Sequence, residues 1–510
     1  MKIRLTLWLL LGAALLPAQS KQDYFWVMGY QTNFAGSGAN GFSFDFRQQP
    51  MDIAYANPEL GTIGNNASIC DEEGGLLFWT NGQAVMNRHL QVMPNGDSIN
   101  AGRWQELFWP NPFRGYPGAQ DVLALPDPGY GQGYYLLHKA MVYYPGIIDS
   151  VEIRVSYVDM ALNGGLGDVV YKNEYFYEGQ DLLWGYLSAV RHANGQDWWV
   201  LQPALGDSLI YAFLVDDSGI AMAGAQNSSQ YFSQFYSSAA GTAQFSPDGT
   251  KYALYNYNDQ LHIYDFDRET GALSNHQKIH VFPPEEIAPS QLRFSSVEWS
   301  PNSRFVYTAT WLELHQVDTW ADDPQSAVQL IDTYNGTQDP FPTTFFLMAQ
   351  GPDCRIYMVS TNGSYSMHVI NKPDELGTAC DFVQNGIVLP HAHGSGLPNF
   401  PRFRVDEAEK CDPTISSVFG VPVHYRRPLE VFPNPSRGHF QVVLPEGFGR
   451  GRLSAIAPSG QRLLSRQVGP GGGTEAIDLS GLPSGAYFIE LHPEDGRERV
   501  FYGQQVVKVD

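Results

Sequence analysis

Residues 243–266 read AQFSPDGTKYALYNYNDQLHIYDF. In three short runs, apolar side chains alternate with polar ones, and turn-forming residues separate the runs at 246–249 and 258–259. Alternation with a period of two predicts strands with one buried face, and short turns between them predict antiparallel pairing. This stretch therefore predicts a meander of three strands.

The same unit recurs along the chain. The turn prolines Pro247, Pro301 and Pro352 are 54 and 51 residues apart. First strands of six units are expected at residues 67–69, 122–124, 189–191, 243–245, 297–299 and 346–348. Repeats of about 40–50 residues with several strands each are typical of propeller blades, because one unit buries its faces only against its neighbours.

Two further strands are expected at the ends of the repeat region, at residues 26–30 and 402–405. If they pair, they make a seventh blade and close the ring, which removes exposed sheet edges. The predicted fold is all-β, a seven-bladed β-propeller over residues 21–410, with an open β-sandwich array as the alternative.

Composition excludes several classes of protein. Hydrophobic residues make up 43% of the 510 residues and charged residues 16%, which is too apolar for a disordered chain. Lys and Arg number 31 against 53 Asp and Glu, so the net charge is −22. A nucleic-acid or anionic-membrane binder needs a basic surface, and we expect neither partner.

The first twenty residues have the pattern of a signal peptide. Lys2 and Arg4 precede an apolar run over residues 5–16, and small residues follow up to Ser20. The run is too short to span a bilayer of about 30 Å, and we expect no transmembrane helix in the mature chain. A buried N-terminal helix is the alternative.

Four cysteines follow this segment: Cys70, Cys354, Cys380 and Cys411. An even number in an exported protein favours disulfides, and no close pair suggests a zinc site. Of the three possible connectivities, we expect Cys354 with Cys380 and Cys70 with Cys411. Reduced, buried cysteines are the alternative.

A change in composition follows Cys411. Residues 411–428 are polar and contain several prolines, as linkers do, and a module of some eighty residues occupies 429–510. Its short alternating strands, such as those at 440–444 and 486–491, predict a small Ig-like β-sandwich.

This module resembles the C-terminal sorting domain of the type IX secretion system of Bacteroidetes. The resemblance rests on residues 431–436 (VFPNPS), the turn at 460–461, residues 479–487 (LSGLPSGAY) and the final strand 506–509. Its sorting-motif residues here are Pro433, Asn434, Pro435, Gly485, Tyr487 and Lys508. Gln504 and Gln505 stand where the family often has lysine. The resemblance implies handling by the type IX machinery, passage across the outer membrane, and then release or attachment to the cell surface.

Residues 65–405 resemble an N-terminal propeller region of large Bacteroidetes surface proteins, some of them associated with gliding motility. The motifs that carry this resemblance lie at residues 71–82, 157–169, 246–249, 265–271, 351–357 and 396–400. The resemblance implies architecture and location, and no catalytic residues.

Aromatic residues are the best candidates for ligand contact. They lie in a loop rich in proline and glycine and after the strand 134–137, at Trp104, Phe108, Trp109, Phe113, Tyr116, Tyr143 and Tyr144. Flat rings on loops at a propeller mouth suit sugar rings or peptide side chains. The alternative is that they cap the blade edges as part of the core.

Motifs for metal or catalytic chemistry are weak. His391 and His393 point the same way on an extended segment, but spacing identifies no third ligand. Asp265, Asp267 and Glu269 lack the spacing of a calcium loop and are interpreted as turn residues, and the glycine-rich residues 162–167 as a loop between blades. We therefore expect no metal and no cofactor.

The sequence favours a secreted or outer-membrane surface protein that binds a glycan or a protein. The alternative is a secreted polysaccharide hydrolase or lyase with carboxylates from several blades in the central channel. An enzymatic activity is unsupported by any motif.

Overall fold

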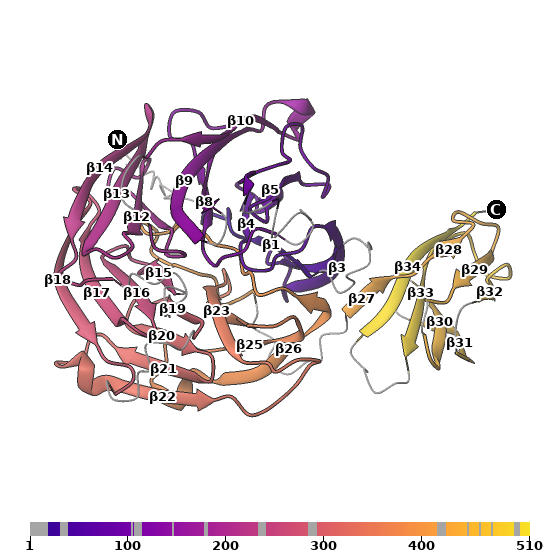
Figure 1. Ribbon diagram of the computed structural model, residues 1–510. Helices are drawn as coiled ribbons and strands as arrows, with labels where there is room; N and C mark the ends of the chain where they lie inside the picture. The colour runs from indigo at the N-terminus through magenta and orange to yellow at the C-terminus, as the bar shows by residue number, and fades with distance from the viewer. Residues whose placement is uncertain are drawn as a thin grey trace, which may run out of the picture.

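The computed structural model describes residues 19–30, 39–103, 106, 115–144, 147–177, 182–232, 241–283, 293–415, 425–445, 448–457, 461–470, 473–493 and 500–509. Within these ranges the regular structure is almost entirely β-strand, and nearly all strand pairs are antiparallel. Figure 1 shows a ring of sheets and, to one side, a smaller domain in orange and yellow.

Seven sheets form the blades of the ring, in chain order. The first two described blades have three strands each: β1 (Phe25–Tyr30), β2 (Ala39–Asp45) and β3 (Asp52–Glu59), then β4 (Ala67–Cys70), β5 (Leu76–Thr80) and β6 (Val85–Asn87). The third and fourth have four each: β7 (Val122–Pro126), β8 (Gly133–Tyr144), β9 (Ile147–Asp159) and β10 (Asp168–Tyr175), then β11 (Ser188–Arg191), β12 (Trp198–Pro203), β13 (Leu209–Asp216) and β14 (Gly219–Asn227).

The remaining three blades also have four strands. They are β15 (Thr242–Phe245), β16 (Lys251–Asn256), β17 (Gln260–Asp267) and β18 (Ala272–Ile279); β19 (Ser295–Trp299), β20 (Phe305–Thr310), β21 (Glu313–Asp318) and β22 (Val328–Thr333); and β23 (Phe345–Gln350), β24 (Ile356–Ser360), β25 (Ser364–Ile370) and β26 (Phe382–His393). Short 3-10 helices occur at Asn163–Gly165, Pro324–Ala327 and Gly377–Cys380. The seven-bladed propeller expected from the repeats is confirmed.

Burial decreases from the centre of the ring outwards. Every residue of the inner strands β15 and β19 is buried, whereas the outer strands β14 and β22 are largely exposed. Aromatic side chains fill the space between blades, as where Trp26 and Phe44 pack on Tyr357 of the last blade. Each blade therefore buries its faces against its neighbours, as a propeller requires.

A central segment, residues 394–411, passes through the middle of the ring. Its Asn399 side chain donates to the carbonyls of Val122 and Leu187, at 3.0 and 2.9 Å, in the third and fourth blades. The Arg402 side chain donates to the Phe245 carbonyl of the fifth blade at 2.7 Å and pairs with Glu298 of the sixth. The channel is thus filled by the chain itself.

The closure of the ring differs from the expected pairing. Residues 402–405 do not form a strand of the first blade: Arg402 makes an isolated bridge with Val190 of the fourth blade, and a turn follows at 403–406. The side chains of Arg402 and Arg404 form ion pairs with Glu298 and Asp23. Arg404 donates to both carboxylate oxygens of Asp23, at 2.6 and 2.7 Å, and so joins the end of the propeller to its beginning. The first blade has its own three strands instead.

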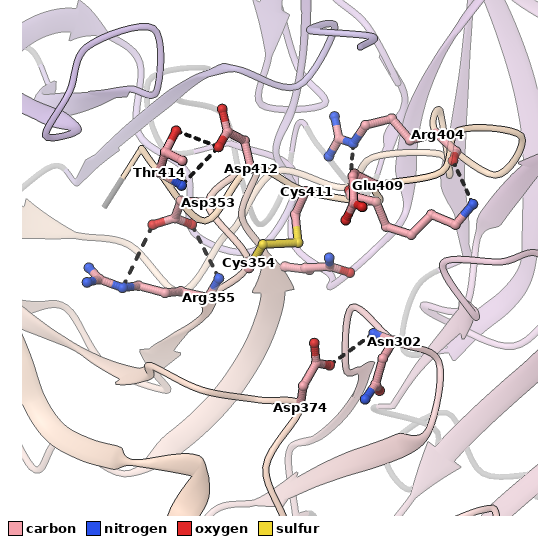
Figure 2. The surroundings of a disulfide bond; sticks show 12 residues. Asn302, Asp353, Cys354, Arg355, Asp374, Arg404, Glu409, Cys411, Asp412 and Thr414 are labelled. Carbon is pink, nitrogen blue, oxygen red and sulfur yellow. Dashed lines mark hydrogen bonds and ion pairs between the residues drawn. A yellow bond between two sulfur atoms is a disulfide. The ribbon is translucent and has the colours of Figure 1, made fainter. Parts of the chain in front are cut away.

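The predicted disulfide pairs were wrong. Cys354 bonds to Cys411 (Figure 2). Cys70 and Cys380 are buried and form no disulfide. Cys354 lies in the turn between β23 and β24, and the central segment ends beside that turn, where the Asp412 amide donates to the Pro352 carbonyl at 2.6 Å. The bond therefore fixes the end of the central segment to the last blade.

The smaller domain is a sandwich of two sheets around one apolar core. One sheet has the order β27-β34-β33-β30-β31 and the other β28-β29-β32. The strands are β27 (Tyr425–Pro428), β28 (Val431–Phe432), β29 (His439–Val443), β30 (Gly451–Ile456), β31 (Arg462–Val468), β32 (Thr474–Asp478), β33 (Gly485–Pro493) and β34 (Val500–Lys508). β27 belongs to the stretch expected as linker, but it pairs in parallel with β34.

Candidate functional site

A cavity of about 240 Å³ opens at one end of the channel. We call it the mouth cavity. Its lining residues lie next to the ends of strands in six of the blades, mostly just ahead of an inner strand: Ile63, Pro117, Gly118, Ala119, Trp184, Gly241, Phe294, Phe346, Thr361 and Ser395. The cavity therefore lies where the blades converge on the axis.

Below the mouth cavity the channel is closed. The space beside Gln120 and Asn399 measures about 20 Å³, which holds little more than one water molecule. Gln120 holds this region together, because its side chain exchanges two hydrogen bonds with the backbone of Ala243, at 2.6 and 2.8 Å. Beside Gln120 and Asn399 the channel therefore has no room for a molecule much larger than water.

Two phenylalanines form one wall of the mouth cavity. The rings of Phe294 and Phe346 are 5.0 Å apart and meet edge to face. Phe346 is buried and its carbonyl accepts a hydrogen bond from Ser296 at 2.7 Å, whereas Phe294 is 36% exposed. The wall is thus a fixed apolar surface with one ring accessible from solvent.

A buried ion pair positions Trp184 on the opposite wall. Lys139 and Asp121 pair at 2.7 Å, and both are fully enclosed. Lys139 also donates to the carbonyls of Leu183 and Gly185, the two residues that flank Trp184. Burial raises the pKa of Asp121 and lowers that of Lys139. The pair therefore fixes the backbone that carries the indole.

Glycine is required at one position of this wall. Gly118 has a φ of +129°, and a Cβ there would lie 2.0 Å from the Asp121 carboxylate and 2.3 Å from the Trp184 indole nitrogen. Only glycine leaves room for these two groups to approach each other. The wall is consequently sensitive to any side chain at this position.

The described lining of the mouth cavity includes none of the aromatic residues expected from the sequence. Trp104, Phe108, Trp109 and Phe113 lie outside the described residues. Tyr116 is only 1% exposed, its hydroxyl accepts from the Met141 amide at 2.8 Å, and it belongs to the interior. Tyr143 and Tyr144 end strand β8, where they pair with β9.

The histidines considered as metal ligands and the glycine-rich segment have structural roles in the blades. His391 and His393 are buried near the end of β26, and their Nδ1 atoms contact the carbonyls of Ala392 and Gly394. Within the described ranges, no three His, Cys, Asp or Glu side chains gather closely enough to hold a metal ion. The glycine-rich residues 162–167 connect β9 to β10 inside one blade, rather than two blades as expected.

The acidic turn residues behave as expected for strand ends. Asp265 pairs with Lys251 at 2.7 Å, and Asp267 accepts from the Glu269 amide and the Thr270 hydroxyl. Both aspartates therefore have partners within their own blade.

The sorting-motif residues meet at one place in the smaller domain. The Asn434 side chain donates to the Gln505 carbonyl and accepts from the Val507 amide, both at 2.9 Å. Ser436 exchanges backbone hydrogen bonds with Val507 and Val509. On the other side of the same strand, Lys508 pairs with Gly485 of β33. Motif segments that are some fifty to seventy residues apart in sequence thus enclose the last strand.

Comparison with protein families identifies the smaller domain. Residues 430–500 match the family model described as the secretion system C-terminal sorting domain. A search of curated protein sequences found no match to the chain.

Solved structures with a similar fold are distant. A protein from Lactobacillus plantarum is 13% identical, with a TM-score of 0.40, and the match covers 74% of this chain and 98% of that one. The Dos1 propeller is 12% identical, with a TM-score of 0.33 and coverage of 65% and 79%. Sqt1 from Saccharomyces cerevisiae is 11% identical, with a TM-score of 0.34 and coverage of 67% and 83%. These likenesses carry no argument about function.

The chain therefore carries a type IX secretion sorting domain and is exported, to be released or attached at the cell surface. Among the described residues, no helix has the length and apolar character needed to cross a lipid bilayer.

Proposed function

We propose that this exported protein is a binding module and that its propeller takes a ligand at the mouth cavity. The observation that carries the proposal is the cavity itself, which has a preformed apolar lining with two aromatic walls and a closed floor. Preformed apolar cavities with a few polar groups are the usual sites of ligand binding.

The alternative, a polysaccharide hydrolase or lyase at the channel, has less support. A glycosidase needs two carboxyl groups that flank the substrate. None of the residues described as lining the mouth cavity is acidic. Inside the channel, Glu298 is paired with Arg402 and also accepts from the amides of Trp299 and Gln350. Both carboxylate oxygens of Glu298 therefore already have partners within the ring.

Binding and catalysis are separated by one experiment. The purified full-length chain is presented with immobilised polysaccharides and peptides, and both retention of the protein and new reducing or unsaturated ends are measured. We expect retention without products, and we expect Phe294→Ala to abolish it because this ring is the accessible part of the wall. New ends released by the native chain and lost in Phe294→Ala would place catalysis at the cavity and contradict the proposal, and so would retention that Phe294→Ala leaves unchanged.

A matched pair of variants tests whether retention depends on the mouth of the propeller or on exposed aromatic residues elsewhere on its surface. Trp311 and Trp320 are exposed tryptophans, 43% and 63%, that flank opposite ends of strand β21 in the same blade. Trp311 has a φ of 28°, a conformation that asparagine tolerates. Trp311→Asn, on the side of the cavity, should weaken retention, and Trp320→Asn should not.

A further inference from the structure

An exposed apolar rim adjoins the mouth cavity on one side. The Trp311 amide donates to the Phe294 carbonyl at 3.3 Å, and the Phe345 amide donates to the Trp311 carbonyl at 2.8 Å. Trp311 therefore lies between the two strands that carry the phenylalanine wall. Its neighbour Leu312 is 47% exposed. We call Phe294, Trp311 and Leu312 the apolar rim.

The chemistry of the lining disfavours a carbohydrate. Among the described lining residues, polar side-chain atoms come only from Thr361, Ser395 and the indole of Trp184. A sugar carries many hydroxyl groups that need hydrogen-bond partners when they leave water, and unpaired polar groups are costly to bury. Contiguous exposed apolar surface beside an aromatic pocket is instead typical of protein-protein contacts.

The volume of the cavity sets the size of the ligand group. A cavity of about 150 Å³ in another protein accepts a benzene molecule. At about 240 Å³, the mouth cavity has room for one aromatic or large aliphatic side chain, with the rim left to contact the residues on either side of it.

The net charge of the propeller indicates which charge the partner segment carries on either side of the inserted side chain. Residues 429–510 contain 8 Lys and Arg and 9 Asp and Glu, which leaves 23 basic and 44 acidic side chains in residues 1–428. Residues 21–410, the propeller, contain 19 Lys and Arg and 43 Asp and Glu and so carry a charge of −24, while the cavity lining has no charged side chain among its described residues. A field of this sign attracts basic segments and repels acidic ones.

We propose that the mouth cavity and the apolar rim bind a basic segment of a partner protein, with one aromatic side chain of that segment inserted into the cavity. This inference rests on the proposed binding function and names its ligand. The inserted ring stacks against Phe294 and Phe346, and basic side chains on either side of it face the acidic body of the propeller.

The test uses the full-length chain and three peptides of equal length: Lys-Gly-Lys-Trp-Lys-Gly-Lys, the same peptide with glutamate in place of lysine, and the basic peptide with alanine in place of tryptophan. Titration calorimetry at low salt gives the dissociation constants. We expect the basic tryptophan peptide to bind at least tenfold more tightly than either of the others, and the advantage over the acidic peptide to shrink as salt is added. Phe294→Ala and Trp311→Asn should each weaken it at least tenfold, and Trp320→Asn should leave it unchanged.

The outcomes distinguish the two proposals. Equal binding of the alanine peptide, equal binding of the acidic peptide, or a loss in Trp320→Asn overturns the inference. Retention on glycans that Phe294→Ala abolishes, with no peptide bound, also overturns it but leaves the proposed function standing. Failure of every peptide and every glycan to bind refutes both.

Discussion

The propeller and the sorting domain both secure a segment at their C-terminal end, but by different chemistry. In the propeller, the central segment is held by buried ion pairs of Arg402 and Arg404 and by the bond between Cys354 and Cys411 (Figure 2). In the sorting domain, β34 is held by backbone hydrogen bonds and by the uncharged Asn434 side chain.

The two regions also differ in what they contain. All four cysteines lie before residue 412 and all eleven tryptophans before residue 321, and neither residue type occurs in 425–510. The propeller therefore depends on a disulfide and on buried ion pairs, whereas the ion pairs described in the sorting domain are at least partly exposed. Tryptophan fluorescence reports on the propeller alone, so the two can be followed separately.

The largest expected effect comes from removing one region. Deletion of residues 425–510 should leave the protein in the periplasm, because the sorting domain directs export. Cell fractionation measures the location, and tryptophan fluorescence of the retained protein should match that of the full chain. Unchanged delivery to the surface would show that export does not need this domain.

Acid should unfold the propeller selectively. Burial lowers the pKa of several propeller histidines, to about 3 for His138, His262 and His368 and to about 4 for His315 and His393. These values lie below the roughly 6.5 of an unfolded histidine, so the unfolded chain binds more protons and stability falls as pH falls from 6.5 towards 4. At pH 5 each group contributes a loss of about 2 kcal/mol.

Urea unfolding at pH 7.5 and pH 5.0, followed by tryptophan fluorescence, measures this loss. Hydrogen exchange of residues 485–493 serves as the comparison, since the histidines described in the sorting domain, His439 and His492, lie at partly or fully exposed ion pairs. Equal losses in both regions would contradict the prediction.

Arg404→Met should destabilise the propeller by about 3–5 kcal/mol, because it leaves the Asp23 carboxylate buried without its partner. Arg466→Met in the sorting domain breaks an exposed pair with Glu475 and should cost less than about 1 kcal/mol. Urea midpoints by fluorescence for the first variant and hydrogen exchange for the second give the two values. Similar costs would mean that Arg404 is not needed to close the ring.

Loss of the disulfide should destabilise the propeller by about 2–4 kcal/mol, because the bond constrains a sequence separation of 57 residues in the unfolded chain. The double variant Cys354→Ser, Cys411→Ser should unfold at lower urea concentration, and a reductant should shift the native protein by the same amount. The reductant should not affect the double variant. A further shift there would indicate a second disulfide.

Asn434→Ala should have a small effect, about 1 kcal/mol in the sorting domain, because it removes two hydrogen bonds that are exposed to water. Hydrogen exchange of the Val507 amide should become several-fold faster, with the propeller unchanged. Arg452→Ala, an exposed change on β30, serves as the control. No change at Val507 would mean that the backbone pairing of Ser436 alone secures the last strand.

Local features of the fold could be predicted from the sequence. The six inner strands from β4 to β23 were located by alternation and by turn residues such as Pro247 and Gly249, and both signals depend only on neighbouring residues. The module that ends the chain was located in the same way, although its first strand, β27, pairs with a strand some seventy residues later and has no local signal.

Contacts across the ring could not be predicted. The partner of Cys411 depends on where the central segment ends, and that position is set by Arg402 and Arg404 reaching distant blades. Trp184, Phe294 and Phe346 come from separate blades, and nothing in one sequence relates them. A usable signal was present, since Trp184 and Phe294 each stand one to four positions ahead of a recognised inner strand.

The contact between Arg404 and Asp23 joins residues 381 positions apart. Contacts of such long range form late in folding, because the loss of chain entropy comes before the gain from packing. A propeller that emerges from its N-terminus first can assemble its early blades but has no residues to fill its centre until position 404 is available. Completion of the ring is therefore tied to delivery of almost the entire propeller sequence, and an incomplete chain remains an open array with an unfilled axis.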